Sequence, residues 1–200
     1  MRTQHSTFFA AFLAVAAMGV PAGSSAHSLE PPVLVLLQND ARVASDVAGR
    51  AQAEVTRLCD LMGVKVAWVT EMPEPGRRAR VVSLVTWEPA DRAIPESVLG
   101  LTYADRGRRR SLAYVFWRRV ERASLKFTAS LPNLLAVAIA HELGHMLLPD
   151  GSHAKHGLME TPWNSAHFRS ASAGLLHFST ETGALIRRGL TDEVTVAQGR

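Results

Sequence analysis

Two histidines and a glutamate stand at a spacing that could hold a metal ion and activate water. They are His141, Glu142 and His145, within the pentapeptide HELGH. On a helix, residues i and i+4 share a face, so both imidazoles can direct a nitrogen at one ion. Glu142 lies beside that face, where it can hold a water on the metal without being a ligand. Zinc suits this set, because it accepts imidazole nitrogen and catalytic zinc sites have three protein ligands and a water.

The segments on either side of the motif favour a helix. The apolar run 134–139 leads into it, Pro132 fits the first helical turn, and Pro149 stops the helix one turn after His145. A metal-free alternative is a buried helix whose two histidines are hydrogen-bonded, and a metal assay separates the two. The motif's mechanics favour the metal.

Length and composition fit one exported domain. The chain has 200 residues, 47% of them hydrophobic, and a formal charge of +4. Residues 1–26 combine Arg2, an apolar stretch over 8–20 and small residues up to Ala26, as in a secretory signal peptide. We therefore predict a single domain over 27–200, a periplasmic or secreted location, and no stable membrane anchor after cleavage, because the apolar stretch is short for a span.

Two further features have simple structural explanations. The basic run 106–110 lacks aromatic residues for stacking beside it, so we expect a solvated hairpin tip and no nucleic-acid partner. Cys59 is the one cysteine and cannot form an internal disulfide. It falls on a helical apolar stripe, which indicates a small buried hydrophobic residue and not a ligand or a nucleophile.

Hydrophobic periodicity predicts the remaining elements. Before the motif we expect, in chain order, a strand at 33–37, a helix at 42–62, strands at 64–69 and 81–87, a hairpin of 98–103 with 112–117, and a polar connection at 118–130. After the motif helix we expect an irregular segment at 161–164 and a helical region at 175–190, in which Ser179 caps a helix. The last residues, 191–200, are expected to be frayed.

This order of elements and the HELGH motif resemble the metzincin superfamily of zinc metallopeptidases, and small exported bacterial members in particular. The resemblance implies an α+β fold with a mixed twisted sheet of about five strands and a helix between strands one and two. It also implies an active-site helix and a small helical C-terminal part. Gly157-Leu158-Met159 resembles the superfamily's tight turn, which places a methionine beneath the metal; Met159 follows His141 by eighteen residues.

The chain departs from the superfamily's pattern at the third ligand. The usual histidine position, six residues after His145, is Gly151, and the next histidine is His153. The segment Pro149-Asp150-Gly151 can still break the helix and turn the chain back. We therefore predict His153 as the third zinc ligand, with His156, Glu181 or Glu160 as alternatives.

Together these observations predict a zinc-dependent peptidase. A zinc-activated water would attack a peptide bond of a peptide or protein substrate, with Glu142 as the catalytic base and then the proton donor. The resemblance implies that an extended substrate adds to the strand at 98–103. Some metzincins have a tyrosine two residues after the turn methionine, and here that residue is Thr161. An inactive zinc-binding exported protein of the same fold is the alternative, and a basic envelope protein with a chance motif is a weaker one.

Overall fold

The protein is described by a computed structural model that covers residues 31–74, 77–88, 94–103 and 111–198. The expected signal peptide at 1–26 and the basic run at 106–110 lie outside these residues. In the described part of the chain, no helix combines the length and the apolar character needed to cross a bilayer.

A five-stranded mixed sheet forms one layer of the fold. Its order is β2-β1-β3-β5-β4, in which β4 pairs with β5 in antiparallel fashion and the other neighbouring strands are parallel. The strands are β1 (Val33–Asn39), β2 (Val66–Val69), β3 (Ala79–Val85), β4 (Gly100–Tyr103) and β5 (Leu112–Phe116). The predicted five strands, the helix between the first two and the hairpin of the last two are confirmed.

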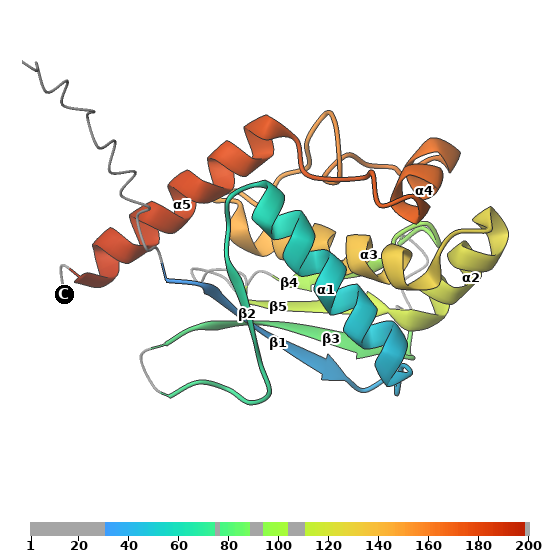
Figure 1. Cartoon of the computed structure of the whole chain (residues 1–200), viewed down its shortest axis with the longest axis horizontal. Coiled ribbons are helices and arrows are strands. Elements are labelled where there is room, and N and C mark those ends of the chain that lie inside the picture. The colour runs from blue at the N-terminus through green and yellow to red at the C-terminus, as the bar shows by residue number, and fades with distance from the viewer. Residues whose placement is uncertain (1–30, 75–76, 89–93, 104–110, 199–200) are drawn as a thin grey trace, which may run out of the picture.

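Helices form the second layer and the C-terminal part. They are α1 (Ser45–Leu61), α2 (Trp117–Phe127), α3 (Leu131–Leu147), α4 (Ser165–Ser172) and α5 (Thr180–Gln198). The helix α1 packs along α3, and α3 in turn contacts β3, β4 and β5 (Figure 1). The α+β class predicted from the sequence is therefore confirmed.

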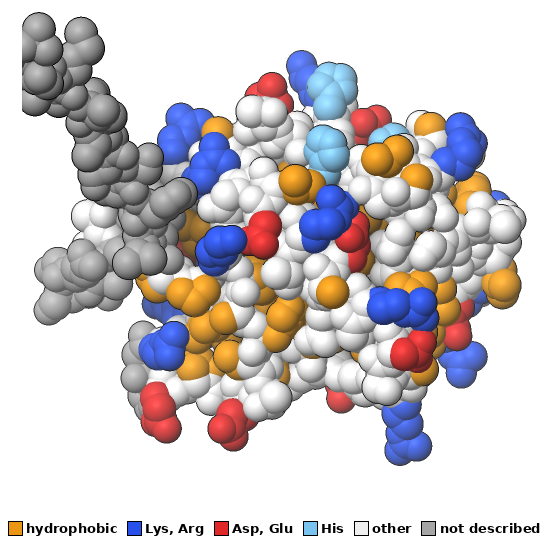
Figure 2. Space-filling view, in the orientation of Figure 1, with side chains coloured by type: hydrophobic (Ala, Val, Ile, Leu, Met, Phe, Trp, Pro, Cys, Tyr) orange, Lys and Arg blue, Asp and Glu red, His pale blue; other side chains and the backbone are white. Residues whose placement is uncertain are grey.

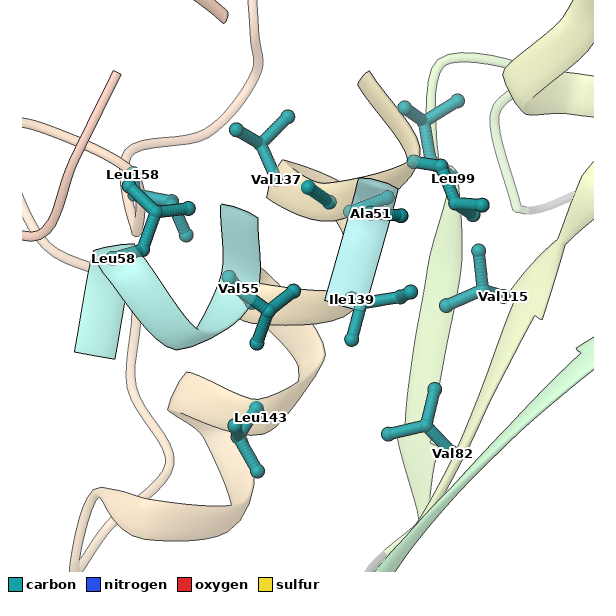
Figure 3. Packing of buried hydrophobic residues seen from close by; sticks show 14 of the residues in the cluster. Ala51, Val55, Leu58, Val82, Leu99, Val115, Val137, Ile139, Leu143 and Leu158 are labelled. Carbon is teal, nitrogen blue, oxygen red and sulfur yellow. The ribbon is translucent and has the colours of Figure 1, made fainter. Parts of the chain in front are cut away.

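The helix α3, which carries the HELGH motif, is the centre of the hydrophobic core. Most of its side chains from Leu134 to Leu147 are buried, so it is apolar on almost every side. Figure 3 shows side chains of α1, α3 and the sheet meeting in this core. The labelled residues in that view are Ala51, Val55, Leu58, Val82, Leu99, Val115, Val137, Ile139, Leu143 and Leu158.

Two helices lie at positions where the sequence analysis predicted none. The helix α2 occupies most of the expected polar connection at 118–130, with Val120 and Arg119 buried and Thr128 in the left-handed conformation at its end. The helix α4 begins at a capping box: the Asn164 side chain accepts from the backbone N–H of His167, whose ring accepts from the N–H of Asn164. Local side-chain bonds of this kind stabilise a helix that has little apolar periodicity.

The C-terminal helix is also longer than predicted. The Ser179 cap is confirmed, because its hydroxyl accepts from the N–H of Thr182 at 3.2 Å, and α5 begins at Thr180. The expectation of a frayed end at 191–200 is wrong, since α5 continues to Gln198. The buried guanidinium of Arg80 in β3 binds Glu193 at 3.1 Å, which ties the last turns of the helix to the sheet.

Surface charge and the single thiol give two more outcomes. On the face drawn in Figure 2, basic side chains are scattered among acidic and apolar ones and form no continuous patch. Cys59 is fully buried, as predicted, and burial raises the pKa of its thiol to about 12. A thiol that stays protonated at neutral pH is a poor nucleophile and a poor metal ligand.

Candidate metal centre

The two motif histidines lie one turn apart near the C-terminal end of α3. Their ring centroids are 4.8 Å apart, and the Nε2 atoms of His141 and His145 face each other at 3.1 Å. This is the arrangement expected of positions i and i+4 on one helical face.

Backbone carbonyls fix the orientation of both rings. The Nδ1 of His141 lies 2.9 Å from the carbonyl oxygen of Leu158, and the Nδ1 of His145 lies 2.8 Å from that of Gly151. A carbonyl only accepts, so each Nδ1 carries the proton and donates it. Each Nε2 therefore presents its lone pair to the other ring. Histidines that bind a metal through Nε2 commonly use Nδ1 in this way.

The chemistry of this donor pair fits zinc. Two lone pairs facing each other at 3.1 Å repel unless a cation lies between them, and two ligands of a tetrahedral zinc ion are about 3.3 Å apart. A shared proton is a poor substitute, because burial, with smaller contributions from the neighbouring histidines, lowers the pKa of His141 to about 3. The residues present are thus suited to a divalent metal.

A turn after α3 brings His153 to the same place. The N–H of Gly151 donates to the carbonyl of Leu148 at 3.2 Å, Gly151 has a φ of +63°, and the Asp150 carboxylate accepts from the N–H of Ser152 at 3.0 Å. The left-handed backbone explains the glycine at 151. His153 is exposed, and its ring centroid lies 4.7 Å from that of His145.

In the described ranges, the three histidines are the one group of three or more potential ligands. Their candidate nitrogens all lie within 4.8 Å of one another. None of the alternative third ligands joins this group. Glu160 contacts His167 at 3.3 Å, His156 is exposed, and Glu181 lies in the first turn of α5. There the backbone N–H of Glu181 itself makes the largest contribution to lowering the pKa of its carboxyl group, and the Ser179 hydroxyl lowers it further.

The segment Gly157-Leu158-Met159 forms a turn that packs against α3. The N–H of Glu160 donates to the carbonyl of Gly157 at 3.0 Å, and Gly157 has a φ of +78°. Met159 is fully buried and its Sδ packs against Gly144, where a Cβ would collide with it and would lie 3.0 Å from the ring of Phe178. A glycine before the second motif histidine thus lets the turn approach the helix.

The Glu142 side chain lies against β4 and also lines the same pocket as the three histidines. Its side chain is buried, and the hydroxyl of Thr102 donates to its Oε2 at 2.7 Å. Burial raises the pKa of Glu142 to about 7, and the Thr102 hydrogen bond opposes the shift. A carboxyl group with this pKa can exchange a proton near neutral pH.

These groups lie at the floor of a cleft with a volume of about 390 Å³. One wall is the segment from Ser97 to Thr102, and the other is Thr161, Pro162 and Trp163. The ring of Trp163 packs edge-on against that of His141, with a distance of 5.5 Å between the ring centroids.

A buried arginine holds the first wall in place. Arg119 of α2 donates to the carbonyls of Pro95 and Val98 at 2.7 and 2.9 Å and also pairs with Glu88 at 3.3 Å. Glu88 binds Arg122 at 2.8 Å as well, and that arginine is half exposed. The segment entering β4 is therefore fixed by a charged group inside the protein.

Comparison with protein-family models, with curated proteins and with solved structures gave no match. The function is therefore inferred from the geometry of this site.

The structure brings together all four residues that the sequence singled out, but it adds partners that sequence reasoning missed. These are the carbonyls of Leu158 and Gly151, the Thr102 hydroxyl and the ring of Trp163. Gly151 in the loop after the motif indicates a turn, and that turn supplies the carbonyl that His145 contacts. The contacts of Thr102 and Trp163 with the motif depend on tertiary structure and leave no local pattern.

Proposed function

We propose that this chain is a zinc-dependent peptidase of the metzincin type, with His141, His145 and His153 as the metal ligands. The observation that carries the proposal is the pair of Nε2 lone pairs opposed at 3.1 Å while both Nδ1 protons are held by carbonyls. This arrangement suits a metal ion and is unfavourable without one.

The residues around the ion have distinct roles in the proposed reaction. A bound zinc would supply a Lewis acid that lowers the pKa of a water and polarises a carbonyl oxygen. Glu142 would accept a proton from the attacking water and then donate it to the leaving amine. The Nδ1 protons of His141 and His145 stay donated to the carbonyls of Leu158 and Gly151.

The proposed substrate is an extended peptide lying along β4. In the described part of the sheet β4 is an edge strand, and the cleft runs between it and the Thr161–Trp163 segment. Backbone groups on such an edge can pair with a further strand. The antiparallel edge strand, the HELGH helix and the buried methionine turn are the features that support the comparison with metzincins.

Zinc content and peptidase assays test this proposal. The purified protein should carry close to one zinc per chain by elemental analysis and should cleave members of a mixed peptide library. Glu142→Gln should keep the zinc and the fold but lose about a hundredfold or more of the activity, the lower range for removal of a general base. A metal-free wild type of unchanged stability, or release of zinc by Glu142→Gln, would contradict the proposal.

A catalytically inactive zinc-binding protein is the second candidate, and one observation favours it. Of the described residues that line the cleft, none is a tyrosine that could stabilise an oxyanion. Thr161 occupies the corresponding position, and Tyr103 packs on Tyr114 away from the cleft. Stoichiometric zinc without cleavage of any peptide would select this candidate.

We also propose that the protein is exported. The apolar stretch and the small residues before His27 support this. Expressed in a bacterium, the product should be found outside the cytoplasm with its N-terminus at or near His27, as measured by fractionation and mass spectrometry. A cytoplasmic product with Met1 intact would refute the proposal.

A further inference from the structure

Two residues of β4, Thr102 and Gly100, lie against the carboxylate of Glu142. The hydroxyl oxygen of Thr102 lies 2.7 Å from Oε2 of Glu142 and 3.1 Å from the backbone carbonyl oxygen of Glu142. A hydroxyl has one proton, and the shorter contact with the stronger acceptor takes it. The Glu142 side chain is only 4% exposed, so this bond is made away from bulk water.

Gly100 makes room for that carboxylate. A Cβ at this position would lie 2.7 Å from the Oε1 of Glu142, 2.8 Å from its Cγ and 2.8 Å from the carbonyl oxygen of Tyr114. The glycine is needed here because of close approach, not because of its backbone angles. Gly100 and Thr102 are two residues apart on a strand, so both present the same face to α3.

The backbone groups of the same two residues point to the open edge of the sheet. The carbonyl of Leu99 accepts from the N–H of Phe116 at 2.8 Å, so Leu99 directs its backbone groups at β5. With the observed register, the antiparallel alternation directs Leu101 inward as well. Gly100 and Thr102 therefore present N–H and C=O groups outward, in the described part of the sheet, where an added strand would pair.

We propose that Gly100 and Thr102 are positioning residues that tie the register of the bound peptide to the direction of the catalytic carboxylate. Their side-chain face holds Glu142, while their backbone groups pair with the substrate. This inference rests on the proposed peptidase function. It assigns to β4 a second role besides binding, because a shift of this strand moves the peptide and the base together.

Removal of the Thr102 hydroxyl tests the inference in the zinc-loaded mature chain. Thr102→Val keeps the shape of the side chain and the backbone pairing. It should keep the zinc and leave KM within about twofold, while kcat falls by about tenfold to a hundredfold, the range for a misplaced catalytic group. Thr102→Ser should recover most of kcat. Thr191→Val, the same change on α5, is the matched control and should leave kcat unchanged. An unchanged kcat in Thr102→Val would overturn the inference.

A double-mutant cycle separates this inference from the proposed function, because it needs no activity. Thr102→Val should lower the folding equilibrium constant about fivefold more in wild type than in Glu142→Ala, where the hydroxyl has lost its acceptor. Equal effects in both backgrounds would overturn the inference, whatever the activity. A coupled cycle in a chain that cleaves no peptide would support the Thr102 contact and refute the peptidase.

Discussion

Replacing Glu142 with glutamine should stabilise the metal-free protein at neutral and alkaline pH. The carboxyl group is buried against β4, and desolvation raises its pKa from 4.5 to about 7. The folded state therefore binds this proton more tightly than the unfolded state does. Ionising the group costs folding free energy, and the cost grows as pH rises from 4.5 to about 7 and is constant above that. Glutamine has nearly the same shape and carries no charge.

The magnitude follows from the two pKa values of this carboxyl group. Each pKa step of one corresponds to about 1.4 kcal/mol, so the full penalty at high pH is about 3 kcal/mol. Below pH 4.5 both states hold the proton, and the free energies of unfolding of the two proteins should differ by a constant amount. The advantage of Glu142→Gln should therefore develop almost entirely between pH 4.5 and 7.

Urea unfolding of chelator-treated wild type and Glu142→Gln at about pH 4.5, 6 and 8 measures this difference. Both proteins contain the same histidines, so the histidine titrations cancel in the comparison. Glu71→Gln removes an exposed carboxylate from the loop after β2 and is the charge-matched control. A difference that stays flat with pH, or a wild type that is the more stable protein at pH 8, would contradict a raised pKa of Glu142 in the folded state.

Three further changes test the parts around this carboxylate. His153→Ala should lose most of the bound zinc by elemental analysis and His156→Ala should keep it; the reverse result would move the third ligand to His156. Arg119→Met should lower the free energy of unfolding by about 3 kcal/mol, because it leaves two carbonyls of the cleft wall and a carboxylate without their buried donor. The control Arg122→Met should cost under about 1 kcal/mol. Equal losses in urea titrations would show that Arg119 does not hold the cleft wall in place. Gly144→Ala should cost about 1–3 kcal/mol by overpacking the turn methionine, and an unchanged melting temperature would show that the two do not touch.

The sequence predicted those elements whose apolar residues repeat with the period of the element. In α1, Ala51, Val55 and Leu58 form a buried stripe, and they define the helix without any tertiary information. The short apolar run beginning at Val33 likewise marks β1, which lies inside the sheet. In α2 the pattern failed, because one of its buried residues is Arg119, a type of side chain that is rarely buried without partners.

The same distinction applies to the candidate site. His141 and His145 are related by helical geometry, which is local, and the turn at Gly151 limits where His153 can lie. The hydroxyl of Thr102 is forty residues from the motif and meets Glu142 only because β4 forms the edge of the sheet. No periodicity records such a contact, so it could not be predicted from the sequence.

The three histidines lie in regions of unequal local stability, and this affects how fast a metal ion could exchange. His141 and His145 belong to a helix buried on almost every side, whereas His153 is exposed on a loop that is held by turn hydrogen bonds. Local opening of such a loop needs much less free energy than global unfolding. We therefore expect a chelator to remove the ion by way of the His153 loop. The release rate should be insensitive to low concentrations of denaturant, while the amide protons of α3 stay protected from exchange with solvent.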